Sequence, residues 1–181
     1  NLKNLTIKNA TVGMLVTKND GTPTPTIDMM NVQIYNCANV GILARTGNIS
    51  GKNVVINNCG QASLACTYGG SYDFTHCTFA NYWNSPSQTS LVLTNENDSN
   101  NIPTALSQAN FKNCIFYGSS NFGIALEKTG TVFNYKFVRC LIKFVDFNNQ
   151  YINGELYNFS SNLNNYVNCI YTLNSNQNLP L

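Results

Sequence analysis

A short segment that ends in asparagine and cysteine recurs along this chain and constrains its fold more than any other feature. Residues Asn53–Cys59 read Asn-Val-Val-Ile-Asn-Asn-Cys, Asn31–Cys37 read Asn-Val-Gln-Ile-Tyr-Asn-Cys, and Asn4–Ala10 form a looser copy. Shorter copies, in which a large apolar residue stands three positions before the cysteine, end at Cys77, Cys114, Cys140 and Cys169. Seven copies of one pattern, roughly 20–30 residues apart, predict a solenoid of stacked coils.

The intervals also contain a second short apolar run, which predicts two or three short strands in each coil. These runs are Val12–Val16, Val40–Leu43, Ser63–Cys66, Ser90–Leu93 and Phe122–Leu126. No segment keeps a helical apolar period, and the 32 asparagines suit turns rather than helices. We therefore expect an all-β, right-handed parallel β-helix of about six to seven coils. A β-sandwich also has many short strands but does not explain the recurring asparagine–cysteine step.

Residues 1–181 fit one domain. We expect this domain to be part of a longer chain, because it opens inside a repeat and neither end looks capped. Three segments between strands predict inserted loops: Thr17–Met30, Asn81–Thr89 and Thr94–Gln108.

The recurring step predicts a left-handed bend. Strand alternation would place the apolar residue and the cysteine three positions later on opposite faces, although both resemble core residues. A single residue with positive φ shifts the alternation and bends the strand, and asparagine and histidine tolerate that conformation. The predicted bend residues are Asn9, Asn36, Asn58, His76, Asn113 and Asn168. Arg139 breaks the pattern, so we expect its coil to turn differently.

Six of the seven cysteines fall on the repeat position, and only Cys66 does not. We interpret them as small buried residues rather than as a disulfide framework or a metal site. Zinc sites use local Cys/His pairs, whereas this chain has one histidine and no C-x-x-C pair. His76 and Cys77 are not expected to form a catalytic dyad, because neighbouring strand residues point to opposite sides. We predict no metal, no cofactor and no catalytic residue.

Acidic residues are few and dispersed, and no two are expected at the same coil position. They are Asp20, Asp28, Asp73, Glu96, Asp98, Glu127, Asp146 and Glu155. Glycoside hydrolysis needs two carboxylates at a defined separation. Glu96 and Asp98 are the only pair close in sequence, and we interpret their asparagine-rich loop as solvated.

Aromatic side chains at the coil edges are the better candidates for binding. Tyr82, Trp83 and Tyr117 follow strand positions in two neighbouring coils, and sugars and protein interfaces both use such side chains. The alternative is that Trp83 packs a loop onto the solenoid. A net charge of +2 with scattered Lys and Arg does not favour nucleic acid, and no segment is apolar enough to span a bilayer.

The copies Asn31–Cys37 and Asn53–Cys59, together with the Phe-x-x-Cys steps, resemble the right-handed parallel β-helix proteins of the pectin-lyase-like superfamily. The stretch Asn57–Trp83 is similar to surface β-helix lipoproteins of Bacteroidota, for which we know of no assigned activity. This resemblance implies an extracellular or outer-membrane setting, with an anchor that the chain itself does not contain.

The resulting expectation is a non-enzymatic cell-surface or secreted module that binds another protein chain or a glycan. A scaffold role, or a place as a subunit of an outer-membrane assembly, fits the same features. The alternative is a carbohydrate-active β-helix, either a polysaccharide lyase or a hydrolase.

Overall fold

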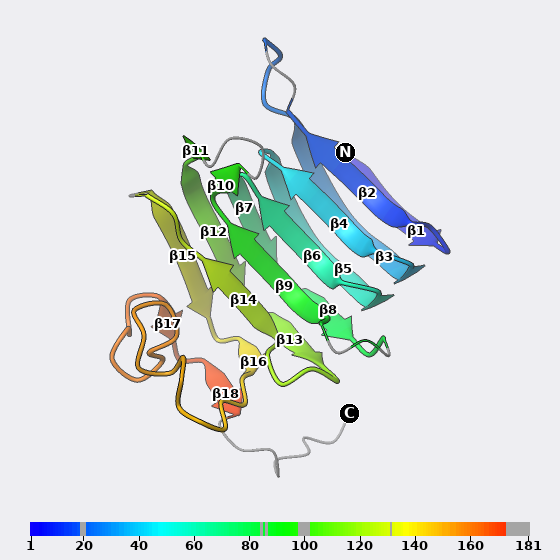
Figure 1. Cartoon of the computed structure of the whole chain (residues 1–181). Helices are drawn as coiled ribbons and strands as arrows, with labels where there is room; N and C mark the ends of the chain where they lie inside the picture. The colour runs from blue at the N-terminus through cyan, green and yellow to red at the C-terminus, as the bar shows by residue number, and fades with distance from the viewer. Residues whose placement is uncertain (19–20, 84, 86, 98–101, 131, 173–181) are drawn as a thin grey trace.

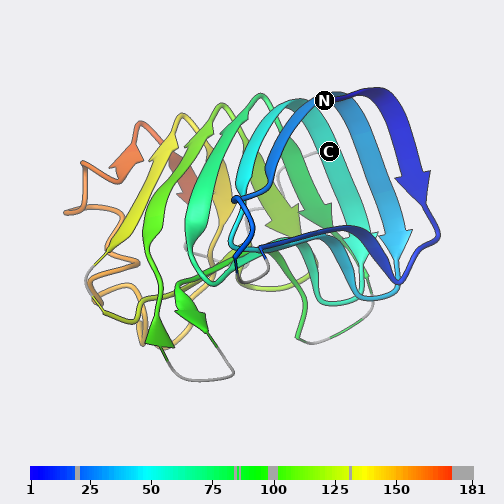
Figure 2. The same cartoon turned by 90° about the horizontal axis from the view of Figure 1, so that it is seen from above.

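The computed structural model describes residues 1–18, 21–83, 85, 87–97, 102–130 and 132–172, and these form a parallel β-solenoid (Figure 1). The described chain contains strands and turns and no helix. Two all-parallel sheets wrap around a common axis, and the coils stack from the blue N-terminal one to the red C-terminal one (Figure 2). The predicted fold class is therefore confirmed.

The larger sheet has eleven strands and includes most of the asparagine–cysteine segments. Its strands are β1 (Leu2–Lys8), β3 (Thr26–Cys37), β5 (Asn48–Cys59), β7 (Gly70–Thr75), β8 (Thr78–Asn81), β12 (Leu106–Lys112), β13 (Ile115–Gly118), β15 (Phe133–Val138), β16 (Leu141–Lys143), β17 (Tyr166–Val167) and β18 (Ile170–Thr172). The 12-residue strand β5 pairs with both β7 and β8, so the long strand of the early coils becomes two short strands in the later ones.

The smaller sheet has five strands, and each of the second apolar runs contributes one of them. They are β2 (Val12–Thr17), β4 (Val40–Arg45), β6 (Ala62–Thr67), β9 (Thr89–Thr94) and β14 (Ile124–Glu127). A short antiparallel pair, β10 (Glu96–Asn97) and β11 (Ile102–Pro103), lies in one of the predicted loops.

The six predicted bend residues all have positive φ, between 50° and 58°. Arg139 also has positive φ, at 53°, and its amide donates to Val167 O at 2.8 Å just as the Asn113 amide donates to Val138 O at 2.9 Å. The expectation that this coil turns differently is wrong. Stacking on the neighbouring coils imposes the bend even on a side chain that does not favour it.

The seven copies belong to two corners of the coil, not one. At the first corner, positive φ occurs at Asn4, Asn31, Asn53, His76, Asn113, Arg139 and Asn168; at the second, it occurs at Asn9, Asn36 and Asn58. Phe74 is in register with Gly51, so Cys77 stacks on Val54 and not on Cys59. The Val54 amide reaches Cys77 Sγ at 3.4 Å.

Side-chain amides link successive coils at the first corner. Asn31 Nδ2 donates to Asn4 Oδ1 at 3.0 Å, and Asn53 Nδ2 donates to Asn31 Oδ1 at 3.2 Å. Further along the same row, Asn113 Nδ2 and His76 Nε2 are 2.8 Å apart. We call these two hydrogen-bonded runs on the outside of the solenoid, Asn4–Asn31–Asn53 and His76–Asn113, the amide ladder.

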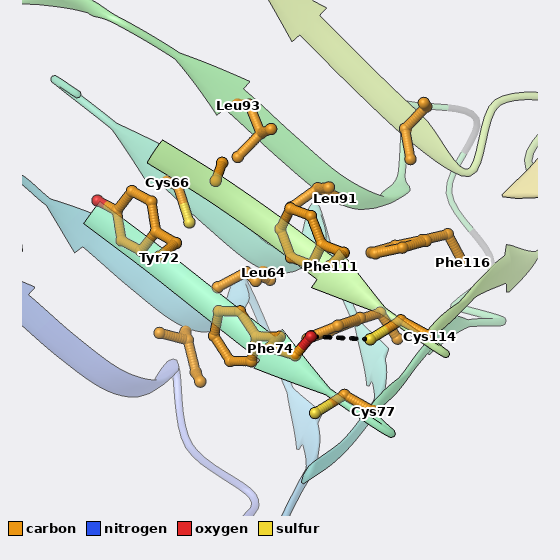
Figure 3. Close-up of a cluster of buried hydrophobic side chains, with 14 of the residues drawn as sticks. Leu64, Cys66, Tyr72, Phe74, Cys77, Leu91, Leu93, Phe111, Cys114 and Phe116 are labelled. Atoms are coloured by element: carbon orange, nitrogen blue, oxygen red, sulfur yellow. Dashed lines mark hydrogen bonds between the residues drawn. The ribbon is translucent and has the colours of Figure 1, made fainter. Parts of the chain in front are cut away.

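Stacked side chains fill the interior (Figure 3). The rings of Phe74, Phe111 and Phe137 stack in sequence, with centroids 5.7 Å and 5.2 Å apart, and Phe79 and Phe116 meet them edge-on. All five side chains are fully buried. The C-terminal coils therefore have an aromatic core, where the earlier ones use Val and Ile.

The cysteines lie beside this core as free thiols. Cys114 Sγ donates to Phe74 O at 3.5 Å and Cys140 Sγ to Phe111 O at 3.4 Å, so each thiol bonds to the coil before it (Figure 3). Six of the seven are buried, and Cys169 is half-buried. The interpretation of the repeat cysteines as small core residues is confirmed.

An irregular segment after β16 covers the C-terminal end of the core. The Asp146 carboxylate accepts hydrogen bonds from the amides of Gln150, Tyr151 and Ile152 at 2.7–3.0 Å. Phe159, from the same segment, is buried against Tyr166 and other aromatic rings. The segment therefore packs its own side chains against the last described coil.

Candidate functional site

The three predicted aromatic residues do not all line the same pocket. Tyr82 follows β8 and approaches Tyr117 of β13; partial burial raises the pKa of Tyr82, and the nearby Tyr117 raises it further. Lys143 Nζ lies 5.3 Å from the centre of the Tyr117 ring and donates to Gly118 O at 2.7 Å. Trp83 instead lines a shallow pocket of about 460 Å³, which Tyr82 and Tyr117 do not line.

The outer face of the five-stranded sheet is apolar. We call the residues Val40, Leu43, Ala62, Ala65 and Val92 the apolar face; they form a hydrophobic cluster separate from the core, in which Val40, Ala62 and Ala65 are buried and Leu43 and Val92 are half-buried. Leu15 extends the Leu43 row at one end and is 57% exposed, and Ala125 extends it beyond Val92. No described element crosses this face, which is turned toward the viewer in Figure 1.

This face forms the floor of a groove of about 620 Å³ with polar edges. At one edge lie the connections that precede the strands: residues 82–88 before β9 and 119–123 before β14 are long, whereas 38–39 before β4 and 60–61 before β6 are short. Among the described residues that line the groove, the side-chain oxygens Asn39 Oδ1 and Gln88 Oε1 are buried and have no hydrogen-bond partner. A buried acceptor left unsatisfied is costly, so a donor entering the groove would stabilise it.

The opposite edge of the groove carries one positive and one negative charge. Arg45 ends β4 and Glu127 ends β14, in a single row that also holds Thr67 and Thr94. Three strand spacings of about 4.8 Å separate the two charges, which is too far for an ion pair. The ion pair that the described residues do form, Lys128–Glu155, involves neither of them.

A second groove, of about 500 Å³, lies on the larger sheet. We call it the charged groove; its charged and polar lining includes Lys3, Asp28, Ser50, Lys52, Asp73 and His76. Asp28, Ser50 and Asp73 are aligned across β3, β5 and β7, and Ser50 Oγ donates to Asp28 Oδ1 at 2.6 Å. The expectation that no two acids share a coil position is therefore wrong for Asp28 and Asp73, which lie two coils apart with Ser50 between them.

The other acidic residues have separate surroundings. Glu96 accepts a hydrogen bond from Thr129 Oγ1 at 2.8 Å, while Asp20 and Asp98 lie outside the described residues. His76 belongs to the amide ladder and contacts Asn113, as expected for a bend residue. Within the described chain, no group of three or more His, Cys, Asp or Glu side chains is arranged to hold a metal ion.

Comparison with known proteins does not assign this chain to a family: no family model, no curated protein and no solved structure matches it. No helix in the described part of the chain is long and apolar enough to cross a membrane.

Proposed function

We propose that this chain is a non-enzymatic β-solenoid module of the cell surface or extracellular space, and that it binds another protein chain through the apolar face. The observation that carries this proposal is the groove on the five-stranded sheet, which has an apolar floor and polar edges and which no described element crosses. Apolar grooves that are rimmed by polar residues mark sites where a partner or ligand binds. The free charges of Arg45 and Glu127 at the edge of this groove supply orientation.

The resemblance to pectin-lyase-like β-helix proteins and to surface lipoproteins of Bacteroidota supports the same setting. In this proposal the solenoid is a scaffold, and its edge aromatics Tyr82, Trp83 and Tyr117 are secondary contacts. The protein interface is favoured over a glycan site because Trp83 lines a pocket that Tyr82 and Tyr117 do not line.

Site-specific photocrosslinking in cells of the source organism tests this proposal. A photoreactive benzoylphenylalanine placed at Ala65 reports on the apolar face, and the same residue at Val55 is the matched control. Both positions lie in the same coil, on β6 and β5. We expect crosslinks to a protein from position 65 and few from position 55. Equal crosslinking from both positions, or none from position 65, would refute the assignment of this surface.

A carbohydrate-active function is the second candidate, favoured by the Asp28–Asp73 pair in the charged groove. Two strand spacings separate these residues, or about 9–10 Å between their Cα atoms, which is near the range used by inverting glycosidases. Both carboxylates are exposed, whereas the general acid of a hydrolase is normally desolvated by its surroundings. Because the two carboxylates are exposed, we place hydrolysis second to protein binding.

A panel of polysaccharides assayed for new reducing ends and unsaturated products decides between the two functions. We expect no product above the level of the buffer blank. Product that disappears in Asp73→Asn, while Glu96→Gln retains it, would establish the second candidate and overturn the first.

A further inference from the structure

The pattern of side chains on the apolar face is self-complementary. We propose that the partner of this face is a second copy of the same chain, in a twofold dimer whose axis runs parallel to the strands, between β6 and β9. This inference rests on the proposed function and names its partner. Face-to-face packing of two sheets with nearly aligned strands is a common arrangement.

The twofold axis sets the register between the copies. It reverses the order of the coils while keeping the strand direction, so β4 of one copy lies over β14 of the other, and β6 lies over β9. Leu43 then faces Ala125 of the other copy, and Ala65 faces Val92. Each larger side chain meets a smaller one, which favours close packing across a spacing of about 10 Å.

The same register pairs the two free charges. Arg45 is on β4 and Glu127 is on β14, at the same position along their strands. Within one chain they are about 14 Å apart, whereas the twofold axis brings Arg45 of each copy opposite Glu127 of the other. An isologous dimer forms every such contact twice, so the dimer contains two Arg45–Glu127 pairs. Arg45 also stacks over Tyr68, with its guanidinium carbon 5.8 Å from the ring centre.

The polar edge fits the same operation. The long connections 82–88 and 119–123 of one copy lie over the short connections 60–61 and 38–39 of the other. The longer connections of each copy therefore face the shorter connections of the other.

The size of the contact predicts a weak dimer. Four opposed strands, about 4.8 Å apart and about 20 Å long, cover roughly 400 Å² per copy. This footprint is about 800 Å² for both copies, and the accessible area lost is smaller because Val40, Ala62 and Ala65 are already buried, so the contact lies below the ~1,000 Å² of specific protein interfaces. We therefore expect a dissociation constant in the micromolar range.

Sedimentation velocity of the purified chain over a range of concentrations tests the dimer. We expect Arg45→Glu and Glu127→Arg each to weaken dimerisation at least about tenfold, because like charges then face each other. The double variant should recover the wild-type constant to within about threefold. Raising the salt to 1 M should weaken the wild-type dimer, because exposed ion pairs are screened.

Lys136→Glu is the control for a charge change elsewhere, since Lys136 is exposed on the larger sheet; it should leave the dimer unchanged. Circular dichroism checks that each variant is folded. A chain that stays monomeric into the millimolar range, or a double variant that is not rescued, would overturn the dimer. If position 65 then crosslinks to a different protein in cells, self-association fails while the proposed function stands.

Discussion

Replacing Arg139 with asparagine should stabilise this protein. Arg139 has φ of 53°, and the six other residues at this corner are five asparagines and one histidine. A left-handed conformation costs most L-residues about 1–2 kcal/mol, and asparagine is among the few that adopt it readily. The native structure therefore holds a local strain at Arg139 that its neighbours do not have.

The size of the effect follows from what the substitution leaves unchanged. The side chain of Arg139 is exposed and takes no part in the ion pair of the described chain. Its backbone bond to Val167 O is present whichever side chain stands there. Relief of most of the left-handed penalty should raise the free energy of unfolding by about 1 kcal/mol. Arg139→Gly should give a smaller gain, because glycine loses about 0.5–1 kcal/mol more chain entropy on folding.

Urea unfolding followed by circular dichroism measures these differences, with the slope checked for a change in the unfolded state. Arg139→Ala is the informative control, since it removes the charge but keeps the Cβ atom that causes the strain; it should stay within about 0.5 kcal/mol of the wild type. Lys136→Asn, in the adjoining strand β15, should not stabilise the chain, because asparagine is disfavoured in strands. Equal stability of Arg139→Asn and Arg139→Ala would refute the assignment of strain to the bend.

Three further results are expected. Phe111→Ala should lower the free energy of unfolding by about 3–5 kcal/mol, because it opens a cavity in the aromatic stack, whereas Trp83→Ala should change it by less than about 0.5 kcal/mol; urea unfolding compares them. Burial raises the pKa of Cys59 and of Tyr157 to about 12, from ordinary values of 9.0 and 10.0. The unfolded chain therefore loses these protons first, and the melting temperature should fall as pH rises from about 9 to 12. Partial burial acts to raise the pKa of Asp146, but the backbone amides that bond to it outweigh burial and hold the pKa below 3.8. Its stabilisation should therefore be present above that pH and decline as the pH falls further, and Asp146→Asn should speed hydrogen exchange in the irregular segment after β16 at neutral pH.

The sequence predicts the local geometry of the repeat well, because the bend has a specific chemical requirement. The positive φ of Asn36, Asn58 and Asn113 follows from the need to turn two nearby apolar residues toward one core. The sequence does not show that Cys77 and Cys59 lie at different corners of the coil. At both corners a residue with positive φ precedes the cysteine, so the two segments look alike. Only the strand register, which places Phe74 beside Gly51, separates them.

The apolar face was harder to predict for a related reason. In β6 both faces carry small or apolar side chains, so alternation does not reveal which side of Ala65 is outside. Similarly, the alignment of Asp28 and Asp73 in one row can be recognised only when the pairing of β3, β5 and β7 is known. The pairing of strands that are distant in sequence therefore determines which side chains lie together on a surface. The recurring bends determine the path of the chain.

The amide ladder bears on how such a chain can diversify. Neighbouring ladder residues are 22 positions apart between Asn31 and Asn53 but 37 positions apart between His76 and Asn113, and their side chains still meet. The additional residues lie in the connections before and after β9, and they do not shift the next turn. Insertions in these connections can therefore change the loops on the surface without changing the stacking of the coils.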